Sequence, residues 1–273
     1  MLAQIIGSIA ENAAEGISEE DYTAEDGLIY CGKCHTPKQT VVEGMKPYIK
    51  DGIVPCACEC QQRAEQQMQT EKQELERRIR IEELRRHCLG GGLYAKLNFS
   101  ADDGHRADIS EICRRYAEEF AENRARGRGL MLMGPVGTGK TFYACCIANA
   151  LIDKGIRAWV TTMQPLLRAC GDFSRDEQTF QRIMTEDMLV LDDFGTTRLT
   201  ERNLELLFEI IDTRYRSGLP LIVTTNLAPA DLRSDRNSIE LVRIYDRLLS
   251  MCVGADESGK IVLDGRSMRR RAV

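Results

Sequence analysis

Long apolar runs are missing from this chain of 273 residues. No segment approaches the roughly 18 consecutive apolar residues that a membrane-spanning helix needs, and the first residues lack the basic stretch of a secretory signal. We therefore expect a cytoplasmic protein without a membrane span. An excess of positive charge is missing too, because the net charge is −5 and the isoelectric point is about 5.5. This balance argues against a uniformly basic coat that would cover nucleic acid.

Aromatic residues are also scarce. They make up 6% of the chain and include a single tryptophan, Trp159. The sequence therefore offers no obvious aromatic platform on which the bases of single-stranded DNA would stack. Hydrophobic side chains, in contrast, make up 43% of the residues. That content and this length are sufficient for one ordinary folded domain and a smaller one.

Residues 134–141 match the motif of a phosphate-binding loop. The motif lies between an apolar run, 130–133, and a helical stretch of small residues, 142–151, which is the strand, loop and helix order that such a loop requires. The glycines let backbone N–H groups turn toward phosphate oxygens at a helix N-terminus. We predict that Lys140 reaches the β- and γ-phosphates of ATP and that the Thr141 hydroxyl binds Mg²⁺. The predicted nucleotide-binding residues are Gly134, Pro135, Val136, Gly137, Thr138, Gly139, Lys140 and Thr141.

Short β-rich runs alternate with helical patterns beyond residue 92, which predicts an α/β fold with a parallel sheet covered by helices on both faces. A short hairpin, 251–253 with 260–263, and a basic tail with Arg266 and 269–271 are expected to follow. This leaves no room for a C-terminal helical lid. The expected strands are 129–133, 158–162, 188–191 and 221–225, and the expected helices are 107–123, 141–154, one from 164, 174–185, 203–217 and 238–249.

Polar residues follow two of the predicted buried strands. Asp192 and Asp193 end one strand, and Asn226 follows the next. In a doubly wound sheet this edge faces the ligand crevice. We predict that Asp192 holds Mg²⁺ through water, that Asp193 orients or deprotonates the attacking water, and that Asn226 positions this water. The alternative is that the acidic pair only caps a turn at the end of a strand.

Five of the eleven cysteines lie within thirty residues near the N-terminus. Zn²⁺ prefers four soft ligands in a tetrahedron, and two short-spaced pairs of cysteines can close such a site. We predict ligation by four of them, with Cys56 as an alternate and His35 as a less favoured candidate. Free buried thiols are the alternative interpretation. The four predicted Zn²⁺ ligands are Cys31, Cys34, Cys58 and Cys60.

A polar stretch rich in Gln, Glu and Arg follows the cysteines and predicts a solvated helix that ends at the glycines 90–92. The expected organisation is therefore a zinc-binding module at 1–60, a helical linker at 61–92 and an ATPase domain at 93–273.

Many relatives with this architecture carry Glu at the position of Asp193. The shorter aspartate is typical of a slow ATPase.

The motifs at 134–141, 189–195, 222–226 and 242–248 together resemble those of the AAA+ ATPases of the DnaC/DnaI helicase-loader group, with IstB transposition helpers as close relatives. The resemblance covers roughly residues 95–273, and the cysteine module also looks like that of DnaI-type loaders. It implies docking on a replicative helicase, binding of single-stranded DNA and self-assembly. It also implies that Arg247 is an arginine finger donated to a neighbouring subunit, with Arg243 as a second candidate. The alternative is that both arginines pair with Glu240 and Asp246 on one solvated helix.

Three functions remain open at this point. The first is an ATP-dependent helicase loader in DNA replication. The second is an IstB-like ATPase that assists a DNA transposase, which the cysteine-rich N-terminus argues against. The third is a nucleotide-gated adaptor that hydrolyses ATP only weakly, which the aspartate at 193 favours.

Overall fold

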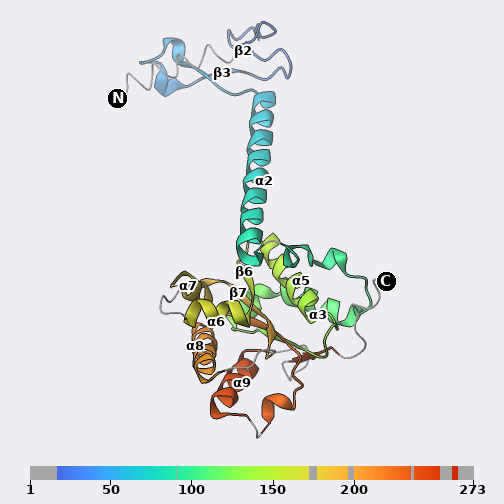
Figure 1. Ribbon diagram of the computed structural model, residues 1–273. Coiled ribbons are helices and arrows are strands. Elements are labelled where there is room, and N and C mark those ends of the chain that lie inside the picture. The colour runs from blue at the N-terminus through green and yellow to red at the C-terminus, as the bar shows by residue number, and fades with distance from the viewer. Residues whose placement is uncertain are drawn as a thin grey trace. The chain divides into compact units, whose positions relative to one another are not determined.

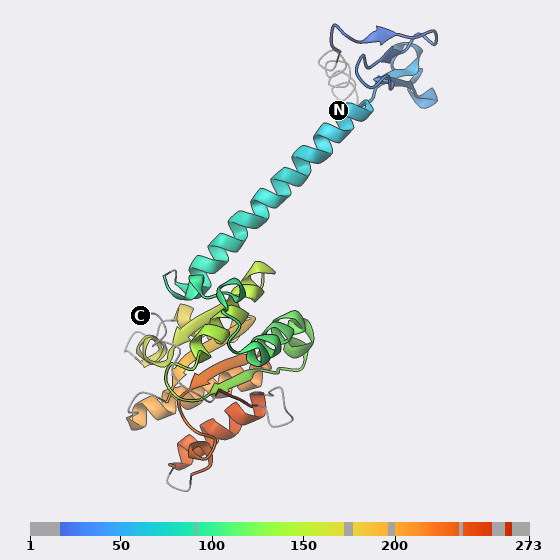
Figure 2. The same ribbon diagram turned by 90° about the vertical axis from the view of Figure 1, so that its right-hand side faces the viewer.

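The computed structural model describes residues 17–90, 92–171, 177–195, 200–234, 237–252 and 260–263. The chain divides into two compact units, residues 1–78 and 79–273. The division falls within helix α2 (Glu59–Leu89), which Figure 2 shows as one unbroken helix. Among the described residues, no helix is both long and apolar enough to cross a membrane. The predicted Arg266 and 269–271 lie outside the described residues.

The described part of the first unit, residues 17–78, contains two small antiparallel sheets and little apolar core. Its most buried charged group is the Asp21 carboxylate, which bonds the Lys38 ammonium at 2.6 Å and accepts the Gly32 N–H at 3.1 Å. These hydrogen bonds hold the pKa of Asp21 well below its usual range, and the bond from Lys38 makes the largest contribution. The elements are β1 (Tyr22–Thr23) paired with β2 (Ile29–Tyr30), β3 (Gln39–Val41) paired with β4 (Ile53–Pro55), and the short helices η1 (Glu43–Met45) and η2 (Lys50–Gly52).

Helix α2 is exposed over most of its length, as its polar composition predicts. Only its end is apolar and buried: Cys88 and Leu89 are 1% and 3% exposed, and Ile81 and Leu84 pack against the core of the second unit. Gly90 follows with φ of 64°, a left-handed conformation that ends a helix at little steric cost. The predicted polar helix and its glycine stop are thus confirmed.

The second unit is built on a five-stranded parallel sheet with the order β6-β7-β8-β5-β9. Strand β8 therefore lies between β5, which leads into the phosphate-loop motif, and β7, which ends in the acidic pair. This arrangement confirms the predicted α/β fold. The strands are β5 (Leu130–Met133), β6 (Ala158–Thr162), β7 (Met188–Phe194), β8 (Leu221–Thr225) and β9 (Lys260–Val262).

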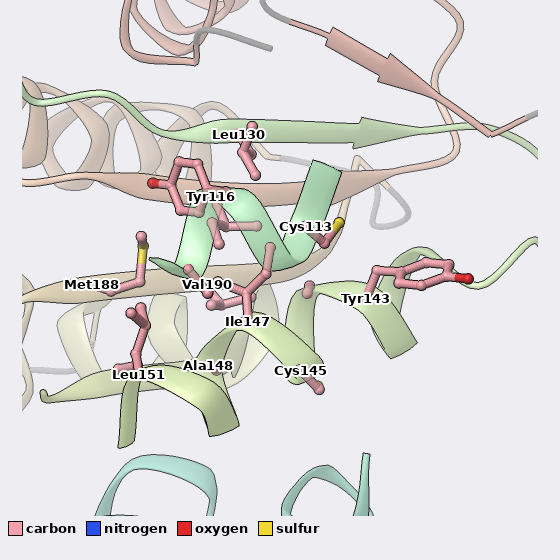
Figure 3. Packing of buried hydrophobic residues seen from close by; sticks show 14 of the residues in the cluster. Cys113, Tyr116, Leu130, Tyr143, Cys145, Ile147, Ala148, Leu151, Met188 and Val190 are labelled. Carbon is pink, nitrogen blue, oxygen red and sulfur yellow. The ribbon is translucent and has the colours of Figure 1, made fainter. Parts of the chain in front are cut away.

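Helices cover both faces of this sheet, so successive strand residues enter different cores. Leu130 and Leu132 join the core formed with α3 (Ala107–Glu118) and α5 (Lys140–Asp153), which Figures 1 and 3 show on one side of the sheet. Met131 and Met133 join the other core. The helices of that second face are α6 (Met163–Gly171), α7 (Glu177–Thr185), α8 (Glu201–Ser217) and α9 (Ile239–Met251).

The predicted hairpin at 251–253 and 260–263 is wrong. Met251 ends α9, and Cys252 forms a parallel bridge with Gly129. Strand β9 pairs in parallel with β5 and becomes the sheet edge. The physical reason is that β5 would otherwise leave a row of backbone groups unpaired on this side. Cys252 pairs with the residue just before β5, and β9 pairs with β5 itself. Among the described residues no helix follows α9.

Two other boundaries differ from expectation. The helix expected at 107–123 is interrupted at Glu119, whose φ and ψ of −85° and 16° separate α3 from α4 (Phe120–Ala125). Strand β7 continues past residue 191 to Phe194 through a shift of register, so the acidic pair belongs to the strand itself. The described part of this unit also contains three single-turn helices: η3 (Tyr94–Lys96), η4 (Phe99–Ala101) and η5 (Asp231–Arg233).

Candidate nucleotide and metal sites

The phosphate-loop motif connects β5 to α5 in the way the sequence predicts. Gly139 is the residue before the first turn of α5 and has φ of 96°, and Gly137 has φ of 85°. Both values lie in the left-handed region that favours glycine. Lys140 is only 5% exposed, and its ammonium donates to the carbonyls of Gly134 and Pro135, each at 2.8 Å. The loop thus folds around the charge that we predict to meet phosphate.

The rest of the loop contains a buried hydrogen bond and two exposed residues. The Thr138 hydroxyl donates to the Pro135 carbonyl at 2.9 Å and is buried. Pro135 is exposed, and Val136 is 61% exposed. The N-terminus of α5 lies at this loop and provides partial positive charge for an anion.

Asp192 lies at the centre of a cluster of hydroxyl groups. Its Oδ1 accepts hydrogen bonds from Thr141 at 2.8 Å and from Thr224 at 2.6 Å, and its Oδ2 accepts one from Tyr94 at 3.2 Å. The carboxylate is buried, with an exposure of 3%. The structure therefore brings together Thr141 and Asp192, the two predicted Mg²⁺ ligands, although 51 positions separate them in the chain.

This donor set is compatible with Mg²⁺. A carboxylate and a threonine hydroxyl are hard oxygen ligands, which this ion prefers, and Lys140 and the α5 N-terminus are adjacent for the phosphates that would share it. Asp192 is buried without an ion pair to a basic side chain among the described residues. The partners of this buried carboxylate are neutral hydroxyl groups, so a bound cation would compensate its negative charge.

Asp193 and Asn226 lie on the exposed rim of this cluster. Asp193 has φ of 54°, an uncommon conformation for a residue other than glycine, and its N–H donates to the Thr224 hydroxyl at 2.9 Å. Such strained residues concentrate at functional sites. Asn226 is exposed and directly follows β8. Their proposed roles toward the attacking water stay predictions.

The two candidate finger arginines differ in their surroundings. Arg247 donates from Nε to Asp212 of α8 at 2.6 Å, and its guanidinium lies 4.6 Å from the centre of the Phe208 ring. Its side chain is 24% exposed. The partner is therefore on α8 and is neither Glu240 nor Asp246. Arg243 is exposed on the same helix.

Four cysteines of the first unit form a compact group. The sulfur atoms of Cys31, Cys34, Cys58 and Cys60 all lie within 4.8 Å of one another. A tetrahedral zinc site with metal–sulfur bonds of about 2.3 Å would separate its sulfurs by roughly 3.8 Å. Hydrogen bonds from Thr36 and from the Cys60 N–H lower the pKa of Cys34 to about 5, whereas the thiol of Cys58 raises that of Cys60 to about 12. These four are the residues that the sequence suggested.

The two less favoured candidates for this metal are engaged elsewhere. The Cys56 thiol donates to the Pro37 carbonyl at 3.4 Å, and burial raises its pKa. The Nδ1 of His35 lies 3.3 Å from the Tyr22 hydroxyl. Neither belongs to the group of four within the described part of the chain.

Two site residues were not predicted. Tyr94 reaches Asp192 across 98 positions of sequence, and no local pattern marks it. Thr224 belongs to the polar triad at 224–226, of which the sequence prediction used only Asn226. Every residue of β8 is buried, so alternation of exposed and buried positions does not mark Thr224; its position on the strand beside β7 does.

The fold and the loop define a P-loop ATP-binding domain of the AAA+ class. The chain belongs to the family of IstB-like ATP-binding proteins, whose model matches residues 59–272. It is 27% identical over 157 residues to the replicative helicase loader DnaI of Bacillus subtilis, covering 53% of this chain and 48% of DnaI. It is 31% identical over 149 residues to a putative ATP-binding protein in an insertion sequence of Mycobacterium tuberculosis, covering 53% and 57% of the two chains.

Solved structures agree with this fold. The crystal structure of the DnaC helicase loader matches 64% of this chain and all of its own, with a TM-score of 0.54 and 24% identity. A putative primosome component from Streptococcus pyogenes matches 64% and 90%, with a TM-score of 0.52 and 21% identity. The chain spans about half the length of the curated relatives it matches. The predicted resemblance to the DnaC/DnaI and IstB group is confirmed.

Proposed function

We propose that this protein is an ATP-dependent helicase loader that acts in DNA replication. The observation that carries the ATPase part is the contact of Thr141 with Asp192, at 2.8 Å, directly beside the buried Lys140. These residues would hold Mg²⁺ and the triphosphate together. Relatives of both kinds, a replicative helicase loader and an insertion-sequence ATP-binding protein, each match 53% of the chain.

The roles of the chain's own residues follow from their positions. The Lys140 ammonium would exchange its loop carbonyls for β- and γ-phosphate oxygens, and Asp193, on the exposed rim, would orient the attacking water and accept its proton. Asn226 would hold the same water. Mg²⁺, when bound, supplies charge stabilisation for the phosphates. Asp is shorter than Glu at position 193, and we therefore expect slow hydrolysis.

The group of four cysteines favours the loader over the transposase helper. It supports a zinc-binding module that docks on a replicative helicase, while the AAA+ domain assembles with other copies and binds single-stranded DNA. An IstB-like role beside a transposase is the second candidate, supported by the relatives from insertion sequences. Full-length protein would be tested for co-purification with ring helicases and, in parallel, with transposases. Capture of a transposase alone would contradict the loader.

The nucleotide site is tested with Lys140→Ala. Each lost charge-assisted hydrogen bond is worth about 1.5–3 kcal/mol, so ATP affinity should fall at least tenfold, measured by calorimetry with Mg²⁺ present. Lys154→Ala is a matched control, because Lys154 follows the other end of the same helix and donates to the Ala117 carbonyl at 2.6 Å. Equal ATP affinity in the two variants would refute the assignment. Tight ATP binding without turnover at any protein concentration would favour the weakly hydrolysing adaptor.

A further inference from the structure

The two oxygens of the Asp192 carboxylate have different partners. Thr141 and Thr224 both donate to Oδ1, whereas the Tyr94 hydroxyl donates to Oδ2 at 3.2 Å. The two threonines belong to elements that the P-loop fold places here, namely α5 and β8. Tyr94 comes from η3, which lies shortly after the glycine stop of α2. A segment that belongs neither to the sheet nor to the helix of the phosphate loop thus contributes one of the three hydroxyl groups.

Tyr94 is held in this position by the helix of the phosphate loop. Asn149 of α5 is 2% exposed, and its Nδ2 donates to the Tyr94 and Leu97 carbonyls, each at 2.9 Å. The same group lies 3.1 Å from the Cys145 carbonyl. Tyr94 also packs against the core that contains α5. Its backbone is therefore tied to α5, while its hydroxyl reaches β7.

The Tyr94 hydroxyl donates to the carboxylate oxygen that neither threonine contacts. Because the terminal torsion of an aspartate side chain has a broad preference, two threonines on one oxygen fix the orientation of the Asp192 carboxylate less well than donors on both oxygens.

We propose that Tyr94 is a positioning residue that holds the Asp192 carboxylate in the orientation that binds Mg²⁺. The inference rests on the proposed ATPase function, since it concerns the metal of the same site. It also implies that the segment just after α2 responds to metal binding, because the segment and the ion share one carboxylate. Binding free energies that are coupled in this way are reciprocal.

The test is Tyr94→Phe in the full-length protein, which removes the hydroxyl and keeps the ring. Binding of a fluorescent ATP analogue is titrated with Mg²⁺, and the same analogue is titrated without metal. Loss of a group that orients a metal ligand typically weakens metal affinity by 10- to 100-fold. Because the two threonines remain, we expect about a tenfold higher Mg²⁺ requirement. Affinity for the metal-free analogue should be unchanged.

Tyr116→Phe is the matched control. Tyr116 is 6% exposed on α3, and its hydroxyl donates to the Arg128 carbonyl at 2.6 Å, so the substitution removes a buried hydrogen bond that does not involve Asp192. Its Mg²⁺ requirement should match the wild type. An unchanged or lower Mg²⁺ requirement for Tyr94→Phe would overturn the inference, as would an equal change in both variants. Failure of the wild-type protein to bind the analogue with Mg²⁺ would instead overturn the proposed ATP site.

Discussion

Thr224 connects the two acidic residues of the site, and its replacement by valine would separate their effects. The residue is 0% exposed in β8. Its hydroxyl donates to Asp192 Oδ1 at 2.6 Å and accepts the Asp193 N–H at 2.9 Å. Valine has nearly the same shape, so Thr224→Val leaves the packing between β7 and β5 intact. The change removes both hydrogen bonds and little else.

The expected cost follows from these two bonds. A hydrogen bond to a charged group contributes about 1.5–3 kcal/mol and a neutral bond about 1 kcal/mol. Asp193 is exposed, and water can therefore replace part of the second bond. We expect the free energy of unfolding of the second unit to fall by about 2–4 kcal/mol. The Mg²⁺ requirement for nucleotide binding should rise by about tenfold, because Asp192 loses one orienting donor.

The single tryptophan provides the assay. Trp159 lies in β6, where it is paired in register with Leu189 of β7, so its fluorescence during urea unfolding reports on this unit. Thr161→Val is the control, since the Thr161 hydroxyl donates a long bond of 3.4 Å to the neighbouring Thr162 carbonyl. The free energy of unfolding of Thr161→Val should fall by less than about 1 kcal/mol.

A double-mutant cycle tests the cause of the loss. In an Asp192→Asn background, Thr224→Val should lower the free energy of unfolding by about 1–2 kcal/mol less than in the wild type. The reason is that the negative charge that strengthens the hydrogen bond from Thr224 is gone. Equal costs in the two backgrounds would refute the reasoning. So would a Thr224→Val variant whose stability and Mg²⁺ requirement match those of Thr161→Val.

Two other sites give direct predictions. Arg247→Ala should keep nucleotide binding but lose the rise of ATPase activity with protein concentration, since Arg247 is proposed to reach a neighbouring subunit's ATP; a rise as steep as in the wild type would contradict the finger. Cys58→Ser should lose zinc in metal analysis of the purified protein, whereas Cys56→Ser, outside the group of four, should retain it. Equal zinc content in the two variants would contradict the assigned ligands.

Several features of the fold could be predicted because they depend on neighbouring residues. The strands 158–162 and 221–225 have the bounds the sequence suggested, since each is a short apolar run between polar turns. Helix α9 begins after Ser238, whose hydroxyl accepts the Leu241 N–H at 3.4 Å as an N-terminal cap. Patterns of this kind need no knowledge of distant partners.

Two of the errors involve distant partners. The run at 260–262 has the composition of a strand, but only the open edge of β5 decides that it pairs in parallel there. Arg247 was given two possible partners on its own helix, whereas the actual one, Asp212, comes from the packing of α9 on α8. Neither partner can be read from spacing along the chain.

The amino-acid sequence by itself determined the phosphate loop, the acidic pair, the clustered cysteines and the alternation of strands and helices, because each is a local pattern of residue types. The tertiary structure decided which side chains meet at Asp192. Insertion of β8 beside β7 brings Thr224 to this carboxylate, and the bonds from Asn149 bring Tyr94 to it. These contacts depend on the order of strands and on the path of the chain after α2, which are set by packing of the whole core.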